Sequence, residues 1–256
     1  MYDFFTRSDV LYSFIDIHNH SLYKVDDGAS SLETMMSMID IAYSDNIKTI
    51  CFTPHFKIYR FSNDEDINAY NALLKSHFSR AQEYAKEKYP DMNLFLACEI
   101  MYHNDIIDSI VSGKCSTMGN SRYILVEFSP HVSKHDLITA LSNISRRGYR
   151  PILAHFERYN CIADDFSLLK ECKDSGALIQ INALSILKFK IGKSSMLAKK
   201  ALKKHLVDIV ATDAHDNKSL TPILSKAHDK VAKKYGADYA KRIFHDNQEQ
   251  ILKASN

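Results

Sequence analysis

Seven short, almost continuous apolar runs alternate with amphipathic stretches along this chain, and this alternation constrains the fold more than any other feature. The runs cover residues 14–17, 49–53, 94–99, 123–127, 151–154, 178–182 and 208–212. Runs of this kind are typical of parallel strands that helices cover on both faces. Because no Gly/Ser-rich linker interrupts the 256 residues, we expect a single α/β domain over residues 1–256.

Two architectures suit such an alternation. One is a single (β/α)7 barrel of the TIM type with seven strands, one fewer than the usual eight. The alternative is an open, doubly wound sheet, which commonly carries a Gly-rich phosphate loop after a strand. The chain has seven glycines and no such loop after any run, so we expect the barrel.

Helix signals lie between the runs. The segment Ser30-Ser31-Leu32-Glu33 reads as a capping box at the start of a helix. Gly148 and Gly176 each follow an apolar helical stripe, as glycines at helix ends do. The remaining helices are expected at about 66–89, from 193 onward, and within 235–254.

Charge and cysteine content exclude several classes of function. The formal net charge is +2, from 33 basic and 31 acidic residues, which favours neither a nucleic-acid-binding nor a membrane surface. The lysines at 199, 200, 203 and 204 have helical spacing and suggest a solvated helix face. No apolar run approaches the ~20 residues needed to span a bilayer. The five cysteines form no C-x-x-C pair, which predicts free thiols and a cytoplasmic location.

Most of the apolar runs end in, or just before, a potential metal ligand. Alternate residues of a strand point to the same side, so His18 and His20 can hold one ion together, as can Asp213 and His215. Considered alone, each of these residues could equally be a loop or strand-end residue that forms a local hydrogen bond. In a barrel, however, the carboxyl ends of the strands meet at one face. The side chains gathered there are His18, His20, His55, Glu99, Glu127, His155, Asp213 and His215, with Asp26 and Asp27 in the first loop.

This ligand set exceeds the needs of one ion. A catalytic zinc uses about three protein ligands, so the number of histidines and carboxylates predicts two or three divalent ions. Paired ions suit phosphoester hydrolysis, because they activate water and bind phosphoryl oxygens together. Mixed histidine and carboxylate ligands are compatible with manganese, iron and zinc.

Specific motifs resemble those of PHP-domain proteins. The resemblance is closest to the manganese-dependent bacterial tyrosine-protein phosphatases of capsule and exopolysaccharide operons. It covers about residues 14–216, followed by a helical segment at about 217–254. The matching segments are Asp16-Ile17-His18-Asn19-His20, Val25-Asp26-Asp27-Gly28, Thr53-Pro54-His55, Glu99-Ile100, 123–128, 148–158 and Asp213-Ala214-His215.

The resemblance implies a seven-stranded distorted barrel with a trinuclear site, manganese being the expected metal. The implied ligand sets are His18, His20, Glu99 and Asp213 for one ion, Glu99, Glu127 and His155 for a second, and Asp27, His55 and His215 for a third. It also implies direct hydrolysis without a covalent enzyme intermediate, and as substrate the phosphotyrosine-rich tail of a membrane-associated bacterial tyrosine kinase. The oligomeric state stays open.

Arg158 matches the family's phosphate-binding arginine, whose planar fork suits phosphoryl oxygens. Two positions depart from the family pattern: Phe156 replaces a proline, and Leu220 replaces a second arginine. Lys218 and Arg60 are further candidates for contacting an anionic substrate.

Other phosphatase and hydrolase classes fit less well. A cysteine phosphatase needs a C-x5-R loop, and six residues separate Cys115 from Arg122. A serine hydrolase needs a G-x-S-x-G elbow, which the chain lacks. The alternatives that stay open are a PHP phosphatase for a small metabolite such as histidinol phosphate, a metallo-amidohydrolase, and a metal-bound regulator without turnover.

Overall fold

The computed structural model describes residues 11–187 and 192–254, and the strands in this part of the chain pair only in parallel. One sheet has the order β1-β2-β4 and the other β3-β5-β6-β7-β8-β9. The strands are β1 (Phe14–Asn19), β2 (Ile47–Phe52), β3 (His55–Phe56), β4 (Asn93–Leu96), β5 (Glu99–Met101), β6 (Tyr123–Glu127), β7 (Arg150–Leu153), β8 (Leu178–Asn182) and β9 (Ile209–Ala211).

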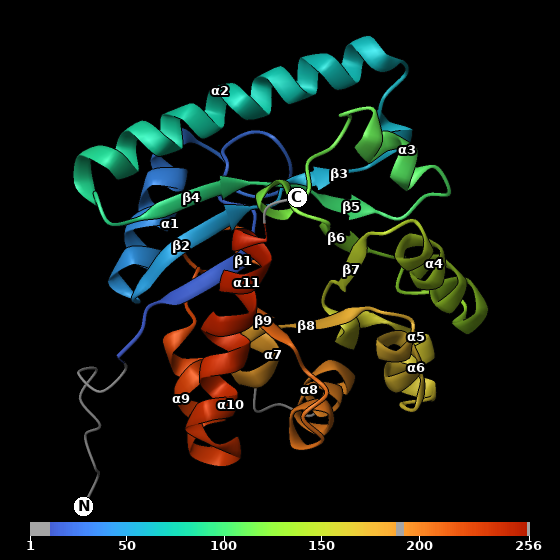
Figure 1. Cartoon of the computed structure of the whole chain (residues 1–256). Helices are drawn as coiled ribbons and strands as arrows, with labels where there is room; N and C mark the ends of the chain where they lie inside the picture. The colour runs from blue at the N-terminus through green and yellow to red at the C-terminus, as the bar shows by residue number, and fades with distance from the viewer. Residues whose placement is uncertain (1–10, 188–191, 255–256) are drawn as a thin grey trace, which may run out of the picture.

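The two sheets curl into one barrel-like body (Figure 1). The first and last strands meet through a parallel bridge between Asn19 and Ala214. The amide of Asp213 donates to the His18 carbonyl at 2.9 Å, which ties the end of β9 to the end of β1. The α/β class and the parallel sheet expected from the sequence are therefore confirmed.

The expected count of seven strands is not confirmed, because two of the expected strands are interrupted. The run at 49–53 stops before Pro54, which has no amide hydrogen for the ladder, and pairing resumes in β3. The run at 94–99 breaks at Ala97 and Cys98 into β4 and β5. Across this break the Ala97 amide still donates to the Phe52 carbonyl at 2.9 Å, which keeps the two sheets continuous.

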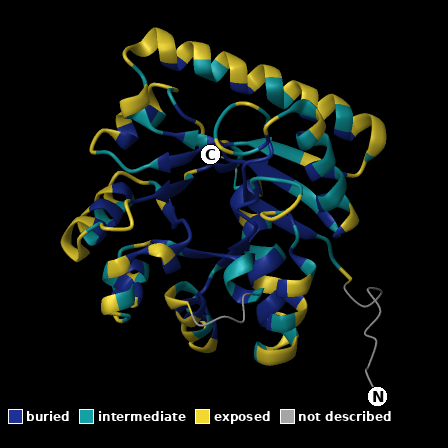
Figure 2. Ribbon diagram, turned by 180° about the vertical axis from the view of Figure 1, so that it is seen from behind, coloured by how far each residue is buried: buried dark blue, intermediate teal, exposed yellow. Residues whose placement is uncertain are grey.

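Helices cover the outside of the curled sheet, with exposed outer faces and buried inner ones (Figure 2). They are α1 (Leu32–Ser44), α2 (Asp64–Lys88), α3 (Ile106–Val111), α4 (Lys134–Arg146), α5 (Asn160–Asp164), α6 (Leu168–Asp174), α7 (Ala183–Leu187), α8 (Lys193–Lys203), α9 (Ser225–Tyr235), α10 (Ala237–Lys241) and α11 (Asn247–Lys253). Short helical turns lie at η2 (Ile58–Arg60), η3 (Met118–Asn120), η4 (Phe156–Arg158) and η5 (Arg242–Asp246).

The helix signals are confirmed with small shifts. The N-cap of α1 is Ser31, whose hydroxyl accepts from the Thr34 amide, so the cap lies one residue after Ser30. Gly148 and Gly176 follow α4 and α6 with φ of +86° and +94°, the left-handed conformation that glycine adopts without strain. No helix of the described residues is long and apolar enough to cross a bilayer.

A compact apolar cluster fills the inside of the curled sheet. It combines strand residues with Ile251 and Leu252 of α11. Gly119 of η3 lies so close to α11 that an added Cβ would be 2.7 Å from the Leu252 carbonyl oxygen. The C-terminal helix thus closes the end of the sheet opposite the ligand-bearing strand ends, which leaves those ends open for a site.

Candidate metal centre

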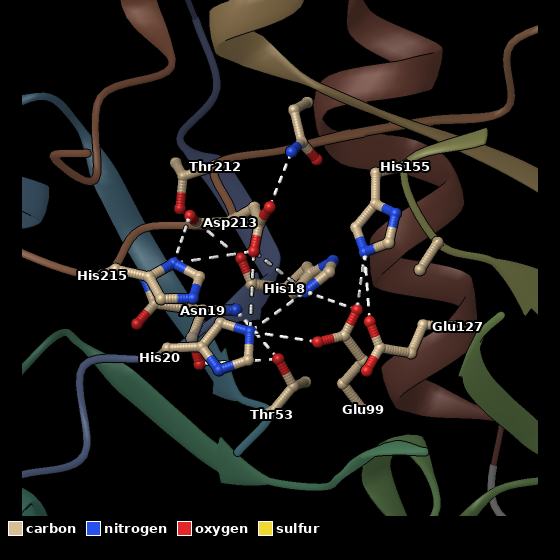
Figure 3. Close-up of polar contacts among 12 residues, drawn as sticks. His18, Asn19, His20, Thr53, Glu99, Glu127, His155, Thr212, Asp213 and His215 are labelled. Carbon is tan, nitrogen blue, oxygen red and sulfur yellow. Dashed lines mark hydrogen bonds and ion pairs between the residues drawn. The ribbon is translucent and has the colours of Figure 1, made fainter. Parts of the chain in front are cut away.

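All nine side chains expected as ligands gather at one face of the curled sheet, and Figure 3 shows seven of them. His18 is the next-to-last residue of β1, and His20 and Asp27 follow this strand in the β1–α1 loop. The others are His55 in β3, Glu99 in β5, Glu127 in β6, His155 after β7, and Asp213 and His215 after β9. The structure groups these nine into four overlapping sets with ligand atoms close enough to share an ion.

The first set forms around the H-x-H pair. The Nε2 atoms of His18 and His20 are 3.2 Å apart, so both imidazoles point at the same place. Carboxylate oxygens of Glu99 and Asp213 each lie 3.3 Å from His18 Nε2. These four side chains are buried.

Glu99 lies at the middle of the site. His155 Nε2 is 2.8 Å from its Oε1, and His55 Nδ1 is 2.9 Å from its Oε2. Glu127 is the next carboxylate, 3.3 Å from His55 Nδ1 and 3.8 Å from His155 Nε2. A carboxylate with imidazoles on both oxygens has the placement of a bridging ligand.

A third group of candidate ligands, Asp27, His55 and His215, is more exposed to solvent. Asp27 Oδ1 lies 3.4 Å from His55 Nε2 and 3.7 Å from His215 Nε2. The ring of His20 stacks on that of His215, with centroids 4.3 Å apart. The geometric sets differ from the implied ones, because His55 also groups with Glu99 and Glu127, and His155 groups with His18 and Asp213.

The donor set fits divalent cations. Burial alone would raise the pKa of Glu99, but the imidazoles of His18 and His155 outweigh it and hold that pKa well below its usual range. Burial opposes protonation of His55, yet Glu127 and Glu99 raise its pKa to about 9. Within the described chain, His55 Nδ1, Glu99 Oε2 and Glu127 Oε1 are buried without a hydrogen bond of normal geometry. Cations would bind these atoms and displace the proton that the imidazole of His55 carries between the carboxylates.

Three polar residues outside the implied ligand sets, Asp26, Gln180 and Asn182, hold the ligands in place. Asp26 Oδ2 lies 2.7 Å from His20 Nδ1 and accepts from the His55 amide at 3.1 Å. Gln180 Oε1 accepts from the His155 amide at 2.7 Å and lies 3.2 Å from His18 Nδ1.

Asn182 completes this support, since its amide nitrogen donates to Asp213 Oδ2 at 2.7 Å. Such partners fix the orientation of metal-binding imidazoles and carboxylates. The only sequence signal for Gln180 and Asn182 was that polar residues interrupt the apolar run of β8.

Arg158 lies beside Asp213, one of the candidate ligands. Its guanidinium donates to Asp213 Oδ2, and it lines a cavity of about 410 Å³ together with Asn182, Leu184 and Leu220. Leu220 therefore faces the same cavity. Phe156 is wholly buried behind His155.

Two candidates for anion contact lie elsewhere. Arg60 and Lys218 do not line the cavity at Arg158. A different lysine, Lys57, reaches the ligands instead, with its Nζ 3.7 Å from Glu127 Oε1. The direction of these loop side chains could not be read from the sequence.

A family model described as "Capsular polysaccharide synthesis, CpsB/CapC" matches residues 14–253. The chain belongs to the CpsB/CapC family. The match extends past the expected core of 14–216 and includes α9 to α11.

Among CpsB/CapC relatives, tyrosine-protein phosphatase CpsB of Streptococcus pneumoniae is 35% identical over 243 residues, 93% of this chain and 98% of that protein. The putative tyrosine-protein phosphatase CapC of Staphylococcus aureus is 32% identical over 201 residues, 78% of this chain and 76% of that protein. A chain from the crystal structures of YwqE from Bacillus subtilis and CpsB from S. pneumoniae, described as metal-dependent tyrosine phosphatases, aligns with a TM-score of 0.83. That alignment covers 94% of this chain and 95% of the other at 23% identity, and it shows the shared fold.

Proposed function

We propose that this protein is a metal-dependent protein-tyrosine phosphatase that acts in capsule or exopolysaccharide synthesis. The observation that carries the proposal is the gathering of nine ligand-type side chains at one face of the sheet, with Arg158 beside them. The names of the CpsB and CapC relatives support the same activity.

We further propose that the nine side chains hold three manganese ions, and that the chain folds as a seven-stranded distorted barrel with two interrupted strands. The ligands would be His18, His20, Asp27, His55, Glu99, Glu127, His155, Asp213 and His215. Bound divalent ions supply Lewis acidity toward the phosphoryl group and lower the pKa of water. The five cysteines are free, which supports a cytoplasmic location.

The chain's own groups bind and orient the substrate. Arg158 presents a planar guanidinium to the cavity, and Asp213 holds that guanidinium in position through a hydrogen bond. Asn182 donates to the same Asp213 oxygen, so this carboxylate is held from two sides. Leu184 and Leu220 provide apolar walls suited to a phenyl ring.

The leaving group also fits tyrosine. A phenol has a pKa near ~10, so phenolate departs with less help from a general acid than an alkoxide requires. Among the described residues that line the cavity at Arg158, the one acid is Asp213. Burial raises the pKa of Asp213, but His18 and Arg158 outweigh burial and lower this pKa to about 2. The cavity lining therefore offers no protonated carboxylic acid to the leaving group. We therefore expect selectivity for phosphotyrosine over phosphoserine.

The deciding experiment compares hydrolysis of a phosphotyrosine peptide, a phosphoserine peptide and histidinol phosphate. The protein is assayed after chelation and again after manganese is added back. Tyrosine-selective activity that returns with manganese and is lost in His155→Ala supports the proposal. The matched control is His135→Ala, an exposed histidine on α4, which should keep full activity. Hydrolysis of histidinol phosphate alone would indicate that the substrate is a small metabolite. No hydrolysis of any substrate with metal bound would refute the proposed enzyme activity.

A further inference from the structure

A second hollow of about 160 Å³ adjoins the cavity at Arg158. Leu184, Thr212 and Leu220 line both, and we call the two together the groove. Its first part also contains Lys193, at the start of α8. Its second part reaches Lys226 on α9. The groove therefore leads from the candidate metal centre to α8 and α9, which contact each other.

These two helices are unusually rich in lysine. The segment from residue 193 to 204 has five lysines and no acid, and α9 has four lysines and one acid, Asp229. We call this set the lysine surface. Its members are Lys193, Lys199, Lys200, Lys203, Lys204, Lys226, Lys230, Lys233 and Lys234.

Helices α8 and α9 contact each other, which brings Lys199 of α8 near Lys230 of α9. The pKa of Lys230 is lowered by burial and by the neighbouring charges of Lys199 on α8 and Lys234 on α9. Lys230 itself donates to the Ile186 carbonyl at 2.8 Å, and its cationic neighbours add to the positive potential of this surface, which attracts anions.

Elsewhere in the described chain, lysines are commonly neutralised. Lys88, Lys134 and Lys173, for example, form ion pairs with acids at 2.5 to 3.3 Å. In contrast, none of the lysines between 193 and 204 forms an ion pair with a described acid. A net charge of +2 for the whole chain hides this local excess.

We propose that the groove and the lysine surface bind the polypeptide around the phosphotyrosine, and select substrates with carboxylate side chains beside it. This inference rests on the proposed function and names the substrate class for the same site. With the phosphate at Arg158 and the ring between Leu184 and Leu220, the flanking chain would follow the groove toward Lys226. Lysine is a compact point charge without a fixed fork, which suits carboxylates at variable positions.

A peptide fits this surface better than a lipid membrane does. The lysines border a groove that begins at the candidate catalytic residues, and a flat bilayer would not reach into it. An extended chain would contact the groove and the helix faces together.

The test uses two phosphotyrosine peptides of equal length, one with glutamates on both sides of the phosphotyrosine and one with glutamines. We expect metal-loaded wild-type protein to prefer the glutamate peptide by about tenfold in kcat/KM at low salt, mainly through KM. The double variant Lys193→Ala/Lys226→Ala should reduce this preference to about twofold, and the corresponding arginine variant should keep it. Added salt should weaken the wild-type preference.

The matched control is Lys75→Ala/Lys86→Ala, which removes the same charge from exposed positions on α2. It should keep the tenfold preference. Failure to hydrolyse either peptide would refute the proposed function itself. Equal hydrolysis of both peptides by wild type would refute this inference and leave the phosphatase intact. Binding to anionic vesicles that depends on Lys193 and Lys226, without any peptide preference, would refute it as well.

Discussion

Replacing Gln180 with methionine should weaken metal binding although Gln180 is not itself a ligand. The Gln180 side chain is buried, and its Oε1 accepts from the His155 amide. An amide oxygen can only accept, so the 3.2 Å contact with His18 Nδ1 places a hydrogen on Nδ1 and leaves Nε2 directed at the ligand cluster. Methionine has a similar volume but can accept neither bond, and it also removes the donation from Gln180 Nε2 to Asn182 Oδ1 at 2.9 Å.

The expected loss of stability follows from the two donors that would lose their acceptor, the His155 amide and His18 Nδ1. Each buried donor left without a partner costs about 1–3 kcal/mol, so the free energy of unfolding should fall by about 2–6 kcal/mol. Losing the partner of a metal-binding imidazole lowers metal affinity by roughly 10- to 100-fold. Calorimetric titration of the chelated protein with manganese would measure the affinity, and urea denaturation would measure stability.

The matched control is Gln248→Met. Gln248 is equally buried and donates to the carbonyls of Val210 and Ile243, but it belongs to α11, at the other end of the sheet. This variant should lose stability while keeping wild-type manganese affinity. If Gln180→Met bound manganese within twofold of wild type, or Gln248→Met weakened binding as much, the positioning role of Gln180 would be refuted.

Three further predictions concern protons, strand closure and the first loop. Since the pKa of His55 is about 9 without metal, His55 is protonated at pH 7 and metal must displace that proton; manganese affinity should therefore rise with pH up to about 9. Calorimetric titration with manganese at pH 7 in two buffers of different ionisation enthalpy should give different binding heats, because the buffer takes up the released proton. Identical binding heats would contradict proton release. Asp16→Ala removes three buried hydrogen bonds, two of them from Thr212, and should lower the free energy of unfolding by about 3–6 kcal/mol in urea denaturation. Gly28→Ala would place a Cβ 1.9 Å from the His20 carbonyl oxygen, so the loop must shift and manganese affinity should fall in the same titration.

Controls separate these effects from general destabilisation. Asp216→Ala removes hydrogen bonds from an exposed turn and should cost far less stability than Asp16→Ala; equal losses would contradict the reasoning. An alanine Cβ at Gly113 meets no atom within 4 Å, so Gly113→Ala should keep manganese affinity despite its φ of +74°. Unchanged affinity in Gly28→Ala as well would contradict the steric argument.

Much of the fold and the site could be predicted from the sequence. Apolar runs located the strands because a strand covered on both faces needs apolar side chains throughout. The convergence of His18 and His20 followed from the two-residue period of a strand, and their Nε2 atoms are 3.2 Å apart. The gathering of distant ligands such as Glu127 and His155 followed from parallel strands, whose carboxyl ends share one face.

The tertiary structure decided the rest. The breaks at Pro54 and at Ala97 depend on how neighbouring strands continue their hydrogen bonds, which the local apolar pattern does not record. Gln180 became a supporting residue only because folding brought β8 beside His18, 162 positions away.

The lysines at the groove illustrate the same limit of prediction from the sequence. Lys193 and Lys226 line it while Lys218 does not, because the direction of a loop or helix-end side chain is set by packing rather than by sequence period. The sequence by itself determined which residues could form a metal centre at the strand ends. Only packing between distant elements determined what supports that centre and which charges face its substrate.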